Sequence, residues 1–93
     1  MMTRQGNRVL VDGPVTFETV EALVADVAAF DGDDLIVDLK GVTNADSSGL
    51  SLLLEWMRRV RGTGKKLEFA NVGPNLRSLA ELYGIVDLLP FGA

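Results

Sequence analysis

LIVDL (residues 35–39), followed closely by DSSGL (residues 46–50), decides the fold of this chain. The first segment is nearly continuous aliphatic, which is typical of a strand covered on both faces or flanked by parallel neighbours. The second segment begins a strongly apolar helix, which we expect from about Ser48 to Arg61 with Asp46 or Ser47 as its N-cap. Two hydroxyl groups therefore lie where a central strand gives way to a helix.

The start of that helix allows two interpretations. Backbone N–H groups without partners and the positive end of the helix dipole stabilise a nearby anion by roughly 0.3–1 kcal/mol. A phosphorylated Ser47 would be such an anion. Alternatively, Asp46 or Ser47 is simply a helix cap, which is worth about 1 kcal/mol.

Composition limits both the class of protein and its chemistry. The 93 residues, 47% hydrophobic and 24% charged, predict a single globular domain over residues 1–93 with its core at about 7–91. No run reaches the roughly 20 apolar residues of a membrane span, and the N-terminus is too polar for a signal peptide, so we expect a cytoplasmic protein without direct membrane insertion. Because cysteine and histidine are absent, we expect no metal site and no cofactor.

Charge is distributed unevenly along the chain. Residues 1–46 carry three basic and nine acidic side chains, whereas residues 47–93 carry six basic and four acidic ones. Five of the basic residues fall between Arg58 and Lys66. This cluster either faces an acidic partner or lipid phosphates, or complements the dipole at a helix C-terminus and stays solvated. No aromatic residues are interleaved with it and no nucleic-acid motif is present, so we expect no nucleic-acid binding.

The remaining helices and strands are predicted from the spacing of apolar residues and from the glycine and proline residues that interrupt it. We expect a strand at 8–12 ended by Gly13-Pro14, with a brief second strand from Val15. A helix capped by Thr16 or Thr19, a strand at 66–72, a helix from Pro74 to Gly84 and a short apolar segment at 85–91 complete the chain. The helix capped by threonine has an apolar face at Val20, Leu23, Val24, Val27 and Phe30. This order predicts an α/β domain: a mixed sheet of about four or five strands with an antiparallel N-terminal pair, and about three or four packed helices.

The helix after residue 47 is more apolar than one sheet face requires. Its apolar residues fill an arc of about 200°, roughly twice the arc that packing on a sheet needs. The surplus lies at Leu52 and Trp56, next to Arg59. That edge is either a protein-binding surface or is buried under a neighbouring helix or the C-terminal tail.

An enzyme built on Asp38, Asp46 and Ser47 is a third class to consider. A serine nucleophile needs a base, but the chain has no histidine and no Ser-x-x-Lys spacing. We therefore expect no catalytic activity.

The order of elements, together with VTNADSSGL at residues 42–50, resembles the STAS domain, the fold of bacterial anti-sigma factor antagonists. The resemblance covers nearly the whole chain and implies a STAS-like mixed sheet. In the antagonists, the hydroxyl residue after the aspartate is phosphorylated by a partner kinase, which corresponds to Ser47 here. The resemblance then implies a switch that binds an anti-sigma factor when Ser47 is bare and releases it when a serine kinase has phosphorylated it.

Within this family, LLLEWMRR (residues 52–59), FANV (69–72) and LAELYG (79–84) are most similar to MlaB-like subunits of phospholipid ABC transporters. This resemblance implies a non-catalytic cytoplasmic subunit that binds the transporter ATPase, lies at the inner membrane through that partner and its permease, and helps to maintain outer-membrane lipid asymmetry. The expected contact residues are Asp46, Ser47, Ser48 and Gly49, flanked by Leu52, Trp56, Thr16 and Phe17. The antagonists typically carry G-E-[LIV]-D in the first loop, where this chain has Gly13-Pro14-Val15-Thr16, and this departure favours the transporter subunit.

Overall fold

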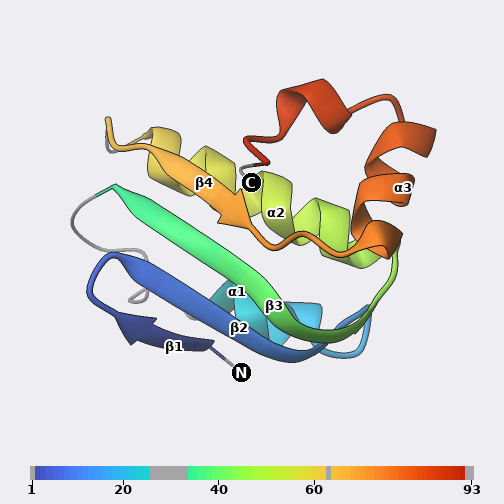
Figure 1. Cartoon of the computed structure of the whole chain (residues 1–93), viewed down its shortest axis with the longest axis horizontal. Helices are drawn as coiled ribbons and strands as arrows, with labels where there is room; N and C mark the ends of the chain where they lie inside the picture. Colours follow the sequence, from blue (N-terminus) through green and yellow to red (C-terminus); the bar gives the residue numbers. More distant parts are fainter. Residues whose placement is uncertain (1, 26–33, 63, 92–93) are drawn as a thin grey trace.

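A computed structural model describes residues 2–25, 34–62 and 64–91 of the chain (Figure 1). Its elements are, in order, β1 (Met2–Gln5), β2 (Arg8–Val15), α1 (Val20–Ala25), β3 (Leu35–Ala45), α2 (Ser47–Arg61), β4 (Leu67–Ala70), α3 (Pro74–Leu82) and a 3-10 turn, η2 (Val86–Leu88). The predicted α/β class is confirmed.

The strands form one mixed sheet in the order β1-β2-β3-β4. β1 and β2 are antiparallel, whereas β2, β3 and β4 are mutually parallel. The predicted antiparallel N-terminal pair is therefore confirmed, but one of its two strands is not a predicted one. β1 was not predicted, because Met2–Gln5 is largely polar. Gly6, with a φ of 62°, lies in the turn that joins the two strands, where a short hairpin favours a residue without a side chain.

The sequence predicted that Gly13 and Pro14 end this strand, but β2 continues to Val15. β1 pairs with β2 only as far as Val11, so Pro14 lies where β2 has a neighbour on one side. Proline, which lacks an N–H donor, is tolerated next to an unpaired side. A register shift between Gly13 and Pro14 absorbs the irregularity and lets β2 and β3 stay paired to Val15 and Ala45.

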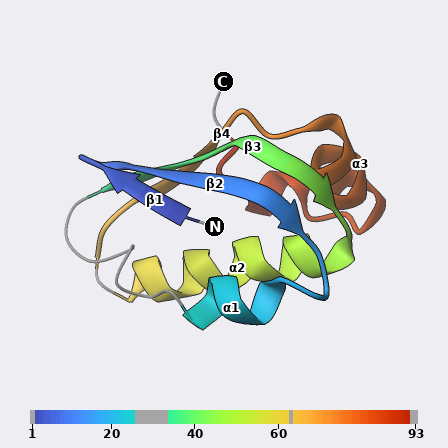
Figure 2. The ribbon, with the colours of Figure 1, turned by 90° about the horizontal axis from the view of Figure 1, so that it is seen from below.

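Helices α1 and α2 lie side by side against one face of the sheet, and α3 lies beyond the end towards which β3 runs (Figure 2). The core fills the space between this sheet face and the helices. Alternate residues of the two central strands contribute to it, together with α2 and β4: Val9, Val11, Val37, Leu39, Leu53 and Phe69.

The opposite side of β3 carries one buried carboxylate, Asp38. Burial raises the pKa of Asp38, but hydrogen bonds from the Asn71 amide, the Lys40 backbone N–H and the Arg8 guanidinium outweigh it, so the pKa of Asp38 lies below its ordinary value. Arg8 Nε lies 3.1 Å from Asp38 Oδ2, and Asn71 reaches Asp38 from a left-handed backbone with a φ of 56°. This network ties β2, β3 and the end of β4 together.

Leu52 and Trp56 are not a surface edge of α2; each exposes only 1% of its area. The second interpretation is therefore correct, because α1 packs beside α2 and gives it a neighbour in addition to the sheet. The exposed apolar edge is the opposite one, at Leu54, which is 38% exposed.

The helix boundaries agree with the sequence in part. α1 begins directly after Thr19, but the Thr19 hydroxyl bonds to the preceding loop rather than capping the helix. Leu23 is buried as predicted, whereas Val27 and Phe30 lie outside the described residues. Pro74 opens α3, and Gly84, with a φ of 70°, follows its end as predicted. The closing apolar segment forms a 3-10 turn.

We predict that Trp56→Ala lowers the free energy of unfolding by about 3–5 kcal/mol, because it leaves a large cavity in the core. Urea denaturation followed by circular dichroism measures this, since the variant lacks the chain's single tryptophan. Phe17→Ala is the matched control: Phe17 is 78% exposed, and its truncation should change stability by less than about 0.5 kcal/mol. Equal effects of the two substitutions would contradict the assignment of Trp56 to the core.

Candidate functional site

Asp46 organises the point where β3 passes into α2. Its Oδ1 accepts the Ser48 backbone N–H at 2.8 Å, which makes Asp46 the N-cap of α2. Its Oδ2 accepts the Phe17 backbone N–H at 3.1 Å. One carboxylate thus joins the start of α2 to the loop between β2 and α1.

Both bonds require the ionised carboxylate. The hydrogen bond from the Phe17 amide has the largest effect and lowers the pKa of Asp46. Desolvation opposes it, but hydrogen bonds from the Ser48 backbone and side chain and from the Gly49 amide keep the pKa below its ordinary value. Amide donors favour the charged form because they lie at the positive end of a peptide dipole. Asp46 therefore stays charged throughout the physiological pH range.

The loop between β2 and α1 has hydrogen bonds of its own. The Thr16 N–H donates to Thr19 Oγ1 at 3.0 Å, and that hydroxyl donates to the Pro14 carbonyl at 2.8 Å. The Thr16 carbonyl accepts the N–H groups of Thr19 and Val20. This loop holds the Phe17 backbone beside the start of α2, and the Phe17 side chain is exposed.

Gly49 allows the first turn of α2 to approach its neighbours closely. A Cβ at this position would lie 3.1 Å from Leu76 Cδ2 and 3.3 Å from the Val15 carbonyl oxygen. Asn75, on α3, donates its side-chain amide to the Ala45 carbonyl. The start of α2 is therefore fixed against both β2 and α3, and Gly49 is buried rather than available to a partner.

One stripe of side chains runs along the exposed side of α2. Ser47, Ser51, Leu54 and Arg58 follow one another at helical spacing and are all exposed. Small hydroxyls occupy the first half of the stripe, and a cation occupies the second. The side of the helix that faces solvent is thus weakly polar at its N-terminal end.

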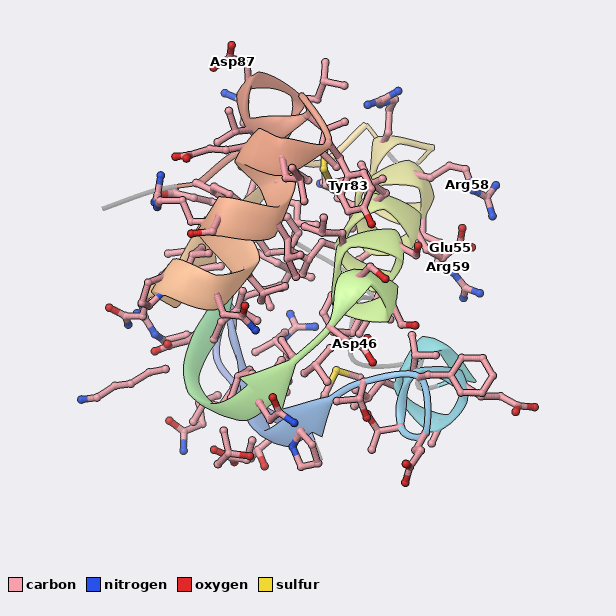
Figure 3. All side chains as sticks on the ribbon, turned by 90° about the vertical axis from the view of Figure 1, so that its right-hand side faces the viewer. Asp46, Glu55, Arg58, Arg59, Tyr83 and Asp87 are labelled. Carbon is pink, nitrogen blue, oxygen red and sulfur yellow. The ribbon has the colours of Figure 1, made fainter. Side chains whose placement is uncertain are left out.

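The residues that follow the end of α3 lie beside this stripe. A hollow of about 370 Å³ lies between the first half of α2 and the chain around Tyr83; Ser47, Ser51 and Leu54 line one side, and Tyr83 and Ile85 line the other. Tyr83, which is 58% exposed, extends from the end of α3 towards α2 (Figure 3).

Charges follow in the next turn of α2. Glu55 binds both Arg58, at 2.6 Å, and Arg59, at 3.2 Å (Figure 3). Hydrogen bonds from the two guanidinium groups lower the pKa of Glu55 below its ordinary value. One carboxylate shared between two arginines leaves an excess of positive charge at this part of the helix.

The predicted contact residues thus fall into two groups. Ser47 and Phe17 are exposed, and Asp46, Ser48 and Thr16 are partly exposed around them. Gly49, Leu52 and Trp56 are buried and do not belong to the surface, because α1, α3 and the sheet cover them. Ser51, Leu54 and Tyr83 were missed; the spacing of Ser47, Ser51 and Leu54 along one helix side would have indicated the first two.

A family model described as the MlaB STAS domain matches residues 1–90 of the chain. The chain belongs to the STAS domain family. STAS domains are protein-interaction domains of anti-sigma factor antagonists and of transporters. No curated protein sequence matches this STAS domain.

Solved structures of similar fold include both kinds of protein. The unphosphorylated anti-sigma factor antagonist SpoIIAA is 18% identical, with a TM-score of 0.75 over 100% of this chain and 87% of its own. An anti-sigma factor antagonist from Mycobacterium paratuberculosis is 23% identical, with a TM-score of 0.74 over 98% of this chain and 81% of its own. A sulfate transporter family protein from Wolinella succinogenes is 18% identical, with a TM-score of 0.72 over 91% of this chain and 74% of its own. At these identities the likeness shows the fold.

The described part of the chain has neither a membrane-spanning helix nor a cluster of metal-ligating side chains. In the ranges 2–25, 34–62 and 64–91, no helix has the length and apolar character needed to cross a membrane. Within the same ranges, acidic side chains do not gather in a group suited to a metal ion.

We predict that Asp46→Ala speeds hydrogen exchange at the Phe17 and Ser48 amides by about three- to tenfold, because both lose their acceptor. Exchange followed by two-dimensional NMR measures this, with Ser47→Ala as a control that keeps both bonds. In the wild type, the stabilisation by Asp46 should be complete above its ordinary pKa of 3.8 and lost as the pH falls through the lower folded value. An unchanged Phe17 amide in Asp46→Ala would contradict the bridge.

Proposed function

We propose that this STAS domain is a non-catalytic subunit that binds the ATPase of an ABC-type phospholipid transporter. In this proposal it is cytoplasmic, lies at the inner membrane through the ATPase and its permease, and supports a system that maintains outer-membrane lipid asymmetry. The match to the MlaB-type family model over residues 1–90 supports this choice among the transporters and regulators that contain the domain.

The observation that carries the proposal is the surface around Ser47. Two small hydroxyls on α2, at Ser47 and Ser51, line a hollow with the exposed Tyr83. A second exposed aromatic residue, Phe17, has its backbone bonded to Asp46 at the start of the same helix. Aromatic residues are favoured at protein interfaces, and small residues beside them let a partner approach the helix backbone. Leu54 extends the same surface. This combination suits a protein partner better than a small polar substrate.

Rigidity adds to the case for binding. Asp46 fixes the Phe17 backbone to α2, and Gly49 and Asn75 fix α2 to its neighbours, so the contact surface is largely formed before the partner arrives. A preformed surface loses less conformational entropy on association than a flexible one. A subunit that only holds and stabilises an ATPase needs such a surface and needs no catalytic group.

We predict that Ser47→Asp weakens binding to the ATPase subunit about tenfold or more, because a second carboxylate beside Asp46 must be desolvated at the interface. Ser78→Asp, the same substitution at an exposed position of α3, should leave the affinity within about twofold. The ATPase is first recovered with its permease by affinity purification of tagged protein from the native host, and affinities are then measured by biolayer interferometry.

Both variants should remain folded by circular dichroism, because Ser47 lies in the first turn of α2, where an acidic side chain is compatible with the helix dipole, and Ser78 is an exposed position of α3. Failure to recover an ABC ATPase would overturn the proposed partner. Recovery of the ATPase with equal affinities for the two variants would instead overturn the placement of the interface at Ser47.

An anti-sigma factor antagonist regulated by phosphorylation is the second candidate. The exposure of Ser47 at the start of α2 favours it, because a kinase needs an accessible hydroxyl. A phosphate would add about −1.5 to −2 charge beside Asp46 and would disrupt a tight contact by repulsion and desolvation. A soluble serine kinase and an anti-sigma factor would then be the partners.

We predict that the protein isolated from its native host carries no phosphate on Ser47 in growth or stationary phase. Intact-mass analysis, with phosphatase inhibitors present during lysis, measures this. A mass increase of one phosphate that disappears in Ser47→Ala would put the phosphorylated switch in first place.

A further inference from the structure

A second hollow lies on the same side of α2, towards its C-terminal end. It has a volume of about 330 Å³ and combines an apolar floor with two cations, Arg61 and Lys65. The floor comes from the end of α2, from β4 and from the C-terminal segment: Met57, Val60, Leu67 and Pro90. From Ser47 to Arg61 the helix extends about 21 Å, so this hollow is separate from the surface around Ser47.

Among the described residues, the charged side chains that line the hollow are all basic. No aspartate or glutamate occurs between Trp56 and Leu67 in the sequence, and no carboxylate lines the hollow among the described residues. Lys66, which is exposed, adds positive charge next to Lys65, whereas Arg58 is paired with Glu55. Two acidic residues lie nearby: Asp34 accepts the Lys66 backbone N–H at 2.9 Å, and Glu68 follows Leu67. The concentration of basic side chains stands out in a protein whose net charge is −4. An anionic ligand with an apolar part would match both features of the hollow.

The shape of the hollow favours a peptide over a membrane. A membrane surface binds proteins that combine basic residues with projecting apolar side chains. Here the apolar groups form the floor between the cations, and Met57, Leu67 and Pro90 are each only partly exposed. The large exposed hydrophobic residues lie elsewhere, at Phe17, Leu54, Leu82, Tyr83 and Leu88. A single side chain of a peptide can enter such a hollow, whereas a flat bilayer cannot.

We propose that the hollow between the end of α2, β4 and the C-terminal segment binds a short acidic peptide segment of a partner protein. One apolar side chain of the segment rests on Met57, Leu67 and Pro90, and flanking carboxylates face Arg61 and Lys65. The binding rests on this hollow alone and does not require the partner proposed for the surface around Ser47.

The test uses the purified protein and a fluorescein-labelled peptide, Glu-Asp-Glu-Glu-Leu-Glu-Asp-Glu, followed by fluorescence anisotropy. We expect saturable binding that weakens when NaCl is raised from about 50 mM to about 300 mM, because salt screens the charge pairs. Replacing the peptide leucine with serine should weaken binding about tenfold, since the apolar contact is lost. Arg61→Glu in the protein should weaken it by a similar factor.

Lys40→Glu is the matched control, because it makes the same change in charge at an exposed position of β3, far from the hollow in the sheet. It should alter the affinity less than about twofold. Equal losses in Arg61→Glu and Lys40→Glu would show a general charge effect and overturn the site. Equal binding of the leucine and serine peptides would overturn the role of the apolar floor. Binding to phosphatidylglycerol vesicles without binding to the peptide would overturn the peptide in favour of a membrane.

Discussion

The carboxylate of Asp46 is the interaction on which the surface of this domain depends. It accepts one amide from α2 and one from the loop after β2, so two segments distant in sequence share a single acceptor group. The position of Phe17 relative to Ser47 follows from this sharing. Serine or threonine would serve as a helix cap equally well, but each has one side-chain oxygen and could not also hold the loop in the same way. The aspartate before the hydroxyl therefore has a structural reason that is independent of phosphorylation.

Close packing around that bridge determines how α2 leaves the sheet. β2 and β3 remain paired as far as Val15 and Ala45, and the Asp46 N–H then bonds to the Val15 carbonyl. Gly49 brings the next turn within contact of that same carbonyl and of Leu76. A larger side chain would push α2 away from both. The long parallel pairing and the glycine together place the hydroxyl stripe of α2 beyond the carboxyl end of β3, the end of the strands at which open α/β sheets commonly bind ligands.

The sequence predicted the architecture because its strongest signals are local: an aliphatic central strand, an aspartate cap and a long apolar helix. β1 escaped prediction because Met2–Gln5 has no apolar alternation, and its pairing depends on the turn at Gly6. For the edge of α2 at Leu52 and Trp56, the sequence left partner binding and burial as alternatives, and the structure shows that this edge is buried. An apolar arc shows that a helix has more than one neighbour but not on which side, so the choice between Trp56 and Leu54 required the position of α1. Tyr83 was missed because its helical spacing from Leu76 and Ala80 is that of a core residue, whereas α3 ends at Leu82 and Tyr83 follows as its C-cap.

One helix thus carries two chemically different surfaces. The first half of its exposed side has hydroxyls and aromatic neighbours, and the second half has cations around an apolar hollow. The basic residues near the C-terminus of α2 also complement its dipole, so they stabilise the helix whether or not a partner is bound. Because the same cations suit both the helix dipole and an acidic partner, the charge pattern of the sequence could not distinguish a solvated helix end from a binding surface. The apolar floor makes the difference, because a helix end that needs only solvated cations has no reason to surround a hollow lined by Met57, Leu67 and Pro90.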